Sequence, residues 1–320
     1  MSLPFDVQAM VRRIGILAPI LALSLSVGCS GSAPLEGALD ASADGKPGAE
    51  VVAVATPDAR AAPETTVGVA SSVAVDGGPT APSPRPFAND ARAHGGSGFD
   101  ADTVLAVRYG EHEGYERVVL DLGAGEEPAG VVPRWTLASP EGDGLTRIHL
   151  PSASATGVSD GRFGEGLVKG FHVVRAPEGG MFVDVTARRA FRYRTLELAD
   201  PARLVVDFQT AGVPLKKPLP AVGGETVLVE PHSGARVSDP LTVSGYSRNF
   251  EAANTIVLKD DGGKELVRET VTANDWSTTW GYFEATLDLP PFSGKGVLQV
   301  GTSGARDGSF EGVEIPVRGG

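Results

Sequence analysis

The chain has 320 residues, a formal net charge of −12 at pH 7 and a single cysteine, Cys29. An acidic chain is a poor candidate for nucleic-acid binding, which requires a basic face, and anionic polymers repel it unless a local basic patch overrides the average. A single cysteine also excludes an internal disulfide, so any folded domain must be stable through core packing alone.

The first segment has the order of a secretory signal: basic residues, then an apolar run, then small residues. Arg12 and Arg13 precede the apolar residues 14–28. That run is shorter than the roughly 20 residues that a membrane-spanning helix needs, and Pro19 interrupts it. We therefore interpret residues 1–28 as a signal peptide that is removed on export.

Cys29 stands directly after this segment, where a thiol can accept a diacylglycerol through a thioether. The residues Ser26-Val27-Gly28-Cys29 resemble the lipobox of bacterial lipoproteins, although that family usually has Leu where this chain has Ser26. The resemblance implies a protein anchored in the cell membrane by two or three acyl chains, on its extracytoplasmic side. The alternatives are a core cysteine that remains after ordinary signal cleavage, and an uncleaved membrane anchor.

Residues 29–98 are rich in Ala, Gly, Pro, Ser, Thr and Asp, with almost no aromatic residue before Phe87. Such a segment cannot bury enough apolar surface to offset the entropy that ordering would cost. We interpret it as a disordered tether. Its ends are expected to lie on the order of 45 Å apart, which would separate the folded domains from a lipid surface.

Residues 99–212 alternate short apolar runs with Gly, Pro and Asp, which predicts a β domain without a sustained helical period. The predicted strands are 116–122, 135–137, 145–150, 171–175, 181–186, 191–198 and 202–208. Apolar and polar side chains alternate along 116–122 and 202–208, so one face of each of these strands is expected to be buried.

These two strands are near copies of each other, Glu-Arg-Val-Val-Leu-Asp-Leu and Ala-Arg-Leu-Val-Val-Asp-Phe. If they pair antiparallel, Arg117 faces Asp207 and Arg203 faces Asp121. The alternative is that the four charged side chains are solvated separately on an open sheet face.

Three stretches of this region carry a family resemblance: Val107-Arg108, residues 112–119 and residues 200–207. They resemble the AMIN-like domain of bacterial envelope lipoproteins, over roughly residues 102–210. That family more often has Asp where this chain has Glu116. AMIN domains are β-sandwiches that localise cell-wall amidases and secretins. The resemblance therefore implies a β-sandwich and makes peptidoglycan a candidate ligand.

Residues 213–224 contain three prolines and the pair Lys216-Lys217, and we interpret them as a linker. Residues 225–320 then predict a second β domain, with a hairpin turn at Asp261-Gly262-Gly263. The predicted strands are 226–230, 240–247, 254–259, 264–272, 280–289, 296–301 and 311–318. Seven short strands at this spacing favour an immunoglobulin-like sandwich.

The second domain carries its own resemblance, on residues 230–245, 250–252 and 280–283, on Ser303 and on residues 307–309. They resemble the immunoglobulin-like domain that is associated with bacterial sporulation and germination proteins, over essentially all of 225–318. The family's usual germination companion domain is not recognisable in this chain. The sequence therefore favours a general envelope role over a spore-specific one.

The sequence shows no constellation of catalytic residues or metal ligands. None of the five histidines has a metal-type spacing to a second ligand: His94, His112, His149, His172 and His232. Ser244 lacks the glycine two residues before it that a nucleophile elbow needs. Asp260 and Asp261 are adjacent carboxylates that point apart, and no third ligand is spaced to join them. We expect no catalytic site, metal or cofactor.

The candidate binding residues lie in the second domain. Trp276, Trp280 and Tyr282 place three large rings within seven positions, where they could stack on sugars or on a partner's side chains. Packing in the core or at an edge is the favoured alternative, because an immunoglobulin-like sandwich has a buried tryptophan. Arg248 and Phe250, after the second strand of this domain, form another candidate contact loop, for which an ordinary turn is the alternative.

The sequence thus predicts an all-β protein with two β-sandwich domains in series, AMIN-like and then immunoglobulin-like, after a disordered tether. The predicted function is that of a lipid-anchored binding protein of the cell envelope, which contacts peptidoglycan or an envelope protein and no nucleic acid. The alternative is an accessory subunit of a sporulation- or germination-type envelope complex. An envelope hydrolase would need a site that the sequence does not show.

Overall fold

The computed structural model describes residues 85–140, 142–303 and 309–320. The predicted signal peptide, Cys29 and the tether before residue 85 lie outside the described residues. Within those ranges the secondary structure is almost entirely β-strand, and one 3₁₀ turn, η1 (Phe250–Ala252), is the sole helical element. The predicted all-β fold class is therefore confirmed. The described part of the chain contains no helix with the length and apolar character that crossing a membrane would require.

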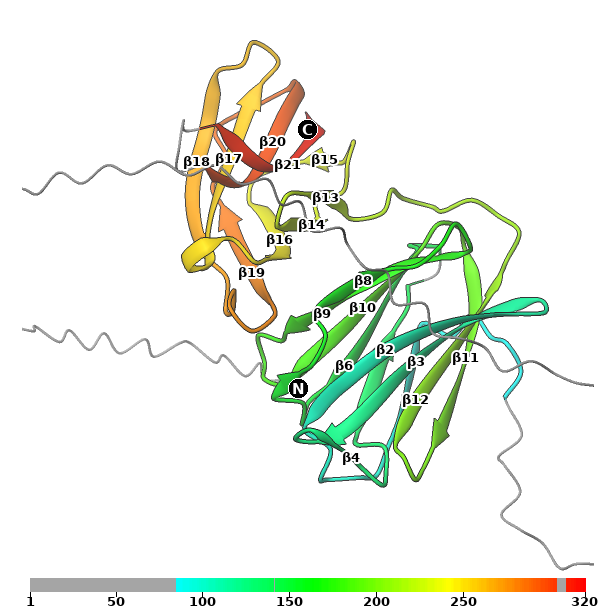
Figure 1. Cartoon of the computed structure of the whole chain (residues 1–320). Coiled ribbons are helices and arrows are strands. Elements are labelled where there is room, and N and C mark those ends of the chain that lie inside the picture. The colour runs from blue at the N-terminus through cyan, green and yellow to red at the C-terminus, as the bar shows by residue number, and fades with distance from the viewer. Residues whose placement is uncertain (1–84, 141, 304–308) are drawn as a thin grey trace, which may run out of the picture. The chain divides into compact units, whose positions relative to one another are not determined.

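The first half of the described chain folds into two facing sheets (Figure 1). One sheet has the order β11-β12-β3-β2-β7, with β4 beside β3, and the other begins β1-β5-β6-β10-β9, with β8 beside β9. The strands are β1 (Arg92–Gly95), β2 (Thr103–His112), β3 (Tyr115–Ala124), β4 (Glu127–Pro128), β5 (Trp135–Ala138), β6 (Leu145–Leu150), β7 (Ala155–Thr156), β8 (Asp160–Arg162), β9 (Val168–Arg175), β10 (Met181–Ala187), β11 (Phe191–Leu198) and β12 (Arg203–Thr210).

The alternation along these strands produces one shared core between the sheets. On β3 the buried side chains are those of Val118, Leu120 and Leu122, with half-buried residues between them. They pack in one cluster with residues from the opposite sheet such as Ile148 and Val183. Burying one such side chain contributes about 1.5–3 kcal/mol, and a core of this size needs no disulfide.

Residues 92–95, which the sequence places at the end of the tether, form β1 and pair with β5. Just before them, Ala88 makes an isolated antiparallel bridge to Tyr193 on β11, the edge of the other sheet. The segment thus closes one side of the sandwich by pairing with both sheets. β1 has four residues, none of them fully buried, and the sequence therefore shows no hydrophobic alternation that would predict this strand.

The predicted pairing of the two near-copy strands is confirmed. β12 and β3 pair antiparallel, with Asp207 opposite Arg117 and Arg203 opposite Asp121. Arg117 donates from Nε and Nη2 to the two carboxylate oxygens of Asp207, at 2.7 and 3.0 Å. The second pair is in register without an ion pair, because Arg108 on β2 binds the carboxylate of Asp121 instead.

The second half of the described chain is also a two-sheet sandwich. β14, β16 and β19 form one layer with β13, while the other has the order β15-β21-β20-β17-β18. The strands are β13 (Ala221–Gly223), β14 (Thr226–Glu230), β15 (Arg236–Val237), β16 (Leu241–Ser247), β17 (Ala253–Asp260), β18 (Glu265–Thr272), β19 (Trp280–Leu287), β20 (Gly294–Ser303) and β21 (Phe310–Gly319).

All seven predicted strands of this domain are present, with β13 and β15 added at the edges. The predicted hairpin turn joins β17 to β18, and Gly263 adopts a φ of +80° there, which glycine accommodates without strain. The core lies between the sheets and includes Phe283, Leu258 and Ile315.

The two sandwiches share a continuous sheet, because β19 pairs in parallel with β9. Trp280 lies opposite Val174 in this pair, and Thr279 donates its hydroxyl to the carbonyl oxygen of Val173 at 2.6 Å. A separate apolar cluster fills the junction and consists of Val174, Ala176, Phe182, Val227, Tyr246 and Trp280. The sequence indicated only a linker between the domains. The structure adds a packed contact.

The interpreted linker is itself held at both sides. The ammonium of Lys217 lies 3.1 Å from a carboxylate oxygen of Asp143 in the first sandwich and 3.0 Å from one of Glu230 in the second. These ion pairs place one cation between two anions, which limits the freedom of a proline-rich segment.

Candidate binding site

Two of the predicted binding residues, Phe250 and Trp276, form an exposed aromatic pair. Their ring centroids lie 5.1 Å apart in an edge-to-face arrangement with an interplanar angle of 75°. Phe250 is 73 % exposed and Trp276 is 37 % exposed. Edge-to-face contact is a favoured geometry for aromatic rings, so the two side chains support each other while remaining accessible.

A buried polar network holds the loop that carries Phe250. Asn249 donates from Nδ2 to Thr226 Oγ1 at 2.9 Å and to Asn254 Oδ1 at 2.8 Å, and Asn254 donates to the carbonyl oxygen of Ala252 at 3.0 Å. Asn249, Asn254 and Thr226 are all buried. A satisfied buried network of this kind fixes a loop in one conformation.

The backbone of this loop is strained. Glu251 and Ala252 have φ values of 56° and 58°, in the left-handed region that residues other than glycine rarely occupy. Each such residue costs on the order of 1–3 kcal/mol and persists only where the surroundings impose it. The buried asparagines supply that constraint, and the result is a fixed turn that presents Phe250 to solvent.

The loop that carries Trp276 is braced separately by Asp275. Its Oδ1 accepts hydrogen bonds from the backbone N–H groups of Trp276, Ser277 and Thr278, at 2.7–3.1 Å. Its Oδ2 pairs with Arg175 of the first sandwich at 3.2 Å. Burial alone would raise the pKa of Asp275, but the backbone N–H groups and Arg175 outweigh it and lower the pKa below its usual value.

Arg248, the other residue predicted in the first contact loop, points into the contact with the first sandwich. Its Nη1 donates to the hydroxyl of Ser159 at 3.2 Å and lies 3.5 Å from Asp160 Oδ1. Its guanidinium is therefore used within the chain, and only Phe250 of this loop faces solvent as a large apolar side chain.

Trp280 and Tyr282 face the junction between the sandwiches. Trp280 is 5 % exposed and donates its indole N–H to Asp160 Oδ1 at 3.2 Å. Tyr282 is half-buried against Phe182 and donates its hydroxyl to Glu284. Burial and the Glu284 carboxylate raise the pKa of Tyr282 to about 12, so it is a neutral donor at physiological pH. Both rings therefore pack within the protein, which is the alternative that the sequence favoured over a binding role.

The junction also encloses a cleft of about 240 Å³, lined in part by His172, Tyr246 and Trp280. The His172 ring lies edge-to-face on Trp280, with centroids 4.9 Å apart, and its Nδ1 is 3.5 Å from the Tyr246 hydroxyl. Burial, with help from the cations Lys169 and Arg162, lowers the pKa of His172. The imidazole is therefore neutral at physiological pH.

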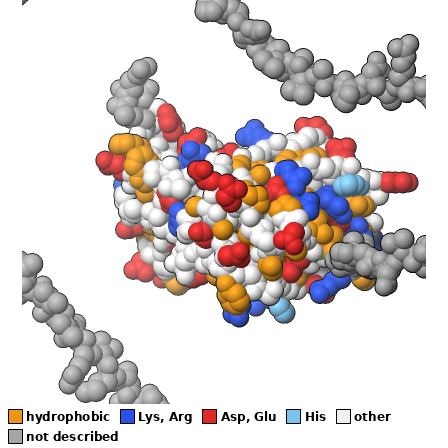
Figure 2. Space-filling model, turned by 60° about the horizontal axis from the view of Figure 1, so that its bottom comes forward, with side chains coloured by type: hydrophobic (Ala, Val, Ile, Leu, Met, Phe, Trp, Pro, Cys, Tyr) orange, Lys and Arg blue, Asp and Glu red, His pale blue; other side chains and the backbone are white. Residues whose placement is uncertain are grey.

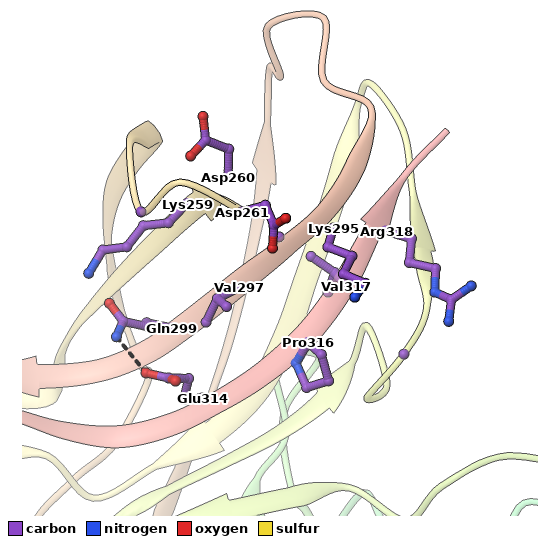
Figure 3. Close-up of a pocket in the computed structure, with 13 residues that line it drawn as sticks. Lys259, Asp260, Asp261, Lys295, Val297, Gln299, Glu314, Pro316, Val317 and Arg318 are labelled. Carbon is purple, nitrogen blue, oxygen red and sulfur yellow. Dashed lines mark hydrogen bonds between the residues drawn. The ribbon is translucent and has the colours of Figure 1, made fainter.

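A second, more open groove of about 600 Å³ runs over the outer face of β17, β20 and β21 (Figure 3). Its charged residues have mixed signs, since Lys259, Lys295 and Arg318 lie near Asp260, Asp261 and Glu314. Gln299 donates to Glu314 across its floor at 2.7 Å. This mixture gives the groove no strong preference for an anion or a cation.

Asp260 has a structural role at one end of that groove. Its Oδ1 accepts the backbone N–H groups of Gly262 and Lys264, both at 2.9 Å, and so closes the hairpin turn. Across the described ranges, no three His, Cys, Asp or Glu side chains are grouped so that they could hold a metal ion.

Comparison with known proteins identifies part of the second sandwich. Residues 226–309 match a family model described as the immunoglobulin-like domain of bacterial spore germination. No curated protein and no solved structure matches the chain. The match agrees with the resemblance seen in the sequence for this domain, and the family is described by its fold and not by a catalytic activity.

The sequence named Phe250 and Trp276 but gave no sign that they meet. They belong to two separate loops, one after β16 and one before β19. Because β16 and β19 are antiparallel neighbours, the end of one and the start of the other lie at the same edge of the sheet. That topology could have suggested the contact once the strand pairing was known.

Proposed function

We propose that this protein is a lipid-anchored binding protein of the cell envelope, which holds an envelope protein or peptidoglycan and performs no catalysis of its own. The observation that carries the proposal is the exposed Phe250–Trp276 pair on two braced loops of the immunoglobulin-like domain. Large, rigid aromatic side chains are the residues on which binding energy concentrates at protein interfaces.

Pre-organisation strengthens this argument. Binding normally costs conformational entropy in proportion to the side chains and loops that become ordered. Here the Asn249 network and the Asp275 turn already hold both loops, so little further ordering is required. A partner that covers both rings would gain apolar burial at a small entropic cost.

The sequence supports the anchor and the location. The signal-like segment before Cys29 resembles that of a lipoprotein, and residues 102–210 resemble an AMIN-like domain. A lipid at Cys29 followed by the long tether would hold the two sandwiches near, but not on, the membrane surface.

The anchor is tested by replacing Cys29 with Ala. We expect the variant to be released from membranes or to accumulate as an unprocessed precursor. Fractionation of cells followed by mass measurement of the chain decides this. A variant of mature size that stays with the membrane would refute lipidation.

The binding surface is tested with the double variant Phe250→Ala/Trp276→Ala in the whole chain, with Phe99→Ala as the matched control. Phe99 is 83 % exposed and belongs to the first sandwich. Crosslinking in cells should return a defined protein partner that the double variant loses and the control keeps. Sedimentation with purified peptidoglycan tests the other candidate ligand, and the double variant should then sediment less than the control. Retention of every bound ligand by the double variant would refute the proposal.

The second candidate function is an accessory subunit of a sporulation- or germination-type envelope complex. The family match of residues 226–309 favours it, because that family is described by bacterial spore germination. Under this alternative the crosslinked partners would form a complex of fixed stoichiometry that persists when peptidoglycan is digested. Partners released by that digestion would favour wall binding instead.

A further inference from the structure

The outer face of the sheet β11-β12-β3-β2 concentrates positive charge on an acidic protein. Residues opposite each other on antiparallel strands share a face, and Val118, Leu204 and Val206 face the core. The registers therefore place the intervening residues outside. The ionisable side chains at these outward positions of the four strands are Arg108, Arg117, Arg192, Arg194, Arg203, Asp121 and Asp207, with His112 at one end.

Five arginines against two aspartates leave an excess of three positive charges on this face, while the chain carries −12 overall. Figure 2 shows both acidic and basic side chains over the visible surface, so the positive excess on this sheet face is local and follows from the strand registers. This face is the local basic patch that can reverse the repulsion between an acidic protein and an anionic partner.

Asp207 organises the centre of the face. Its side chain is 3 % exposed and binds Arg117 at 2.7 Å and Arg194 at 2.8 Å, so one carboxylate neutralises only one of two guanidiniums. The Arg194 guanidinium also packs over two rings, 4.4 Å from the Phe87 centroid and 4.9 Å from the Tyr115 centroid. One positive charge of the excess is therefore held in a fixed position.

Two further guanidiniums have no acidic partner. Over the described ranges, neither Arg192 nor Arg203 forms an ion pair, and Arg203 donates only from Nε to the carbonyl oxygen of Pro201 at 3.3 Å. Their remaining N–H groups can bind a carboxylate in the two-pronged geometry that a guanidinium prefers. At the end of β2 and β3, the rings of His112 and Tyr115 stack at 4.8 Å.

We propose that this face binds an acidic polysaccharide, with the arginines on its carboxylates and the exposed His112 ring, which Tyr115 supports from behind, on its sugars. Nucleic acid is a poorer fit, because affinity at physiological salt needs more phosphate contacts than this face supplies. The proposal does not rest on the Phe250–Trp276 surface, which belongs to the other sandwich.

The test uses a chain that begins at Ser30, and polygalacturonate as the acidic probe with dextran as its neutral counterpart. Polygalacturonate should bind at low salt and weaken as salt is added, while dextran should not bind. The variant Arg192→Gln/Arg203→Gln should bind about fivefold to tenfold more weakly. The control Arg236→Gln/Arg318→Gln removes the same charge from exposed positions of the second sandwich and should bind like the parent chain.

Three results would overturn the proposal: no binding of polygalacturonate at low salt, equal binding of dextran, or equal weakening by the test and control variants. Two further probes are tested separately for binding: vesicles of anionic phosphatidylglycerol, and single-stranded DNA. If either binds as tightly as polygalacturonate and loses affinity in the Arg192→Gln/Arg203→Gln variant, the face recognises charge in general and the polysaccharide assignment is wrong. If polygalacturonate does not bind, the test of the proposed function is unaffected, because that test measures the loss of partners in the Phe250→Ala/Trp276→Ala variant.

Discussion

Both sheets of the first sandwich carry arginine–aspartate pairs on the face turned away from the core, and two of these pairs, one from each sheet, differ in environment. Arg108 and Asp121 lie on the open sheet, with side chains 56 % and 21 % exposed. Arg147 and Asp184 lie on the sheet that the second sandwich covers, and Asp184 is fully buried. Both pairs have two-pronged geometry. Because these two pairs have the same geometry, we expect the burial of Asp184 by the second sandwich to decide how their contributions differ.

The largest expected effect separates these pairs directly. Replacing Asp184 with Asn leaves the Arg147 charge without its partner, and Arg147 lies 3.8 Å above the Phe182 ring in the junction. Breaking a buried pair in this way costs about 3–5 kcal/mol of unfolding free energy. Denaturant unfolding of the whole chain measures it. A loss below about 1 kcal/mol would show that the second sandwich does not cover the pair.

The next prediction compares the two faces of β19. Trp280 packs in the junction and Phe283 in the core of the second sandwich, and truncation of either to Ala should cost about 3–5 kcal/mol. The calorimetric unfolding traces of the two variants should differ, because only Trp280→Ala weakens the contact between the sandwiches. We expect separate unfolding transitions of the two sandwiches in calorimetry for Trp280→Ala. For Phe283→Ala we expect a lower midpoint for the second sandwich. Identical traces would contradict the junction.

A pH effect follows from His172 in the same junction. Asp184 and Asp160 favour its protonated form, but burial, Lys169 and Arg162 outweigh them and lower its pKa below the ordinary value of 6.5. A histidine with a lowered folded-state pKa stabilises the fold above its unfolded pKa, and this contribution is lost as the pH falls.

The free energy of unfolding should therefore decrease between about pH 7 and pH 5, the range in which an unfolded histidine takes up its proton. His172→Asn should flatten this dependence, whereas His112→Asn, an exposed position on the open sheet, should keep it. Urea midpoints at several pH values provide the measurement. An unchanged slope in His172→Asn would show that another group is responsible.

The smallest effect belongs to the open sheet. Asp121→Asn breaks the Arg108 ion pair at a solvent-exposed position, where such pairs contribute about 0–1 kcal/mol. The change should shrink further as salt is added, because exposed charges are screened. A salt-independent loss as large as that of Asp184→Asn would remove the distinction between the two sheets.

Much of the fold could be read from the chain. The alternation in 116–122 and 202–208 predicted both strands and the Arg117–Asp207 contact, because side-chain direction along a strand has a period of two. The seven strands of the second domain and its Asp-Gly-Gly turn followed from the same rule and from the conformational freedom of glycine. The resemblance in residues 225–318 agreed with the family match of residues 226–309.

The candidate site could be predicted only in part. The sequence shows that Trp280 and Tyr282 lie on one face of their strand and Phe283 on the other. Nothing in the sequence revealed that another sandwich would cover the face with Trp280 and Tyr282. The pairing of Phe250 with Trp276 was hidden for a similar reason, since the two residues lie on different loops. The binding role and the lipid at Cys29 stay predictions.

The sequence by itself determined the local elements: which segments are strands, which face of each is apolar and where the turns fall. These depend on interactions between residues that are near in the chain. Only the tertiary structure decided which outward faces stay open and which become buried, as Arg108–Asp121 and Arg147–Asp184 illustrate. Burial of a sheet face depends on the packing of segments about a hundred residues apart, as between Val173 and Thr279, and that packing is not encoded in local periodicity.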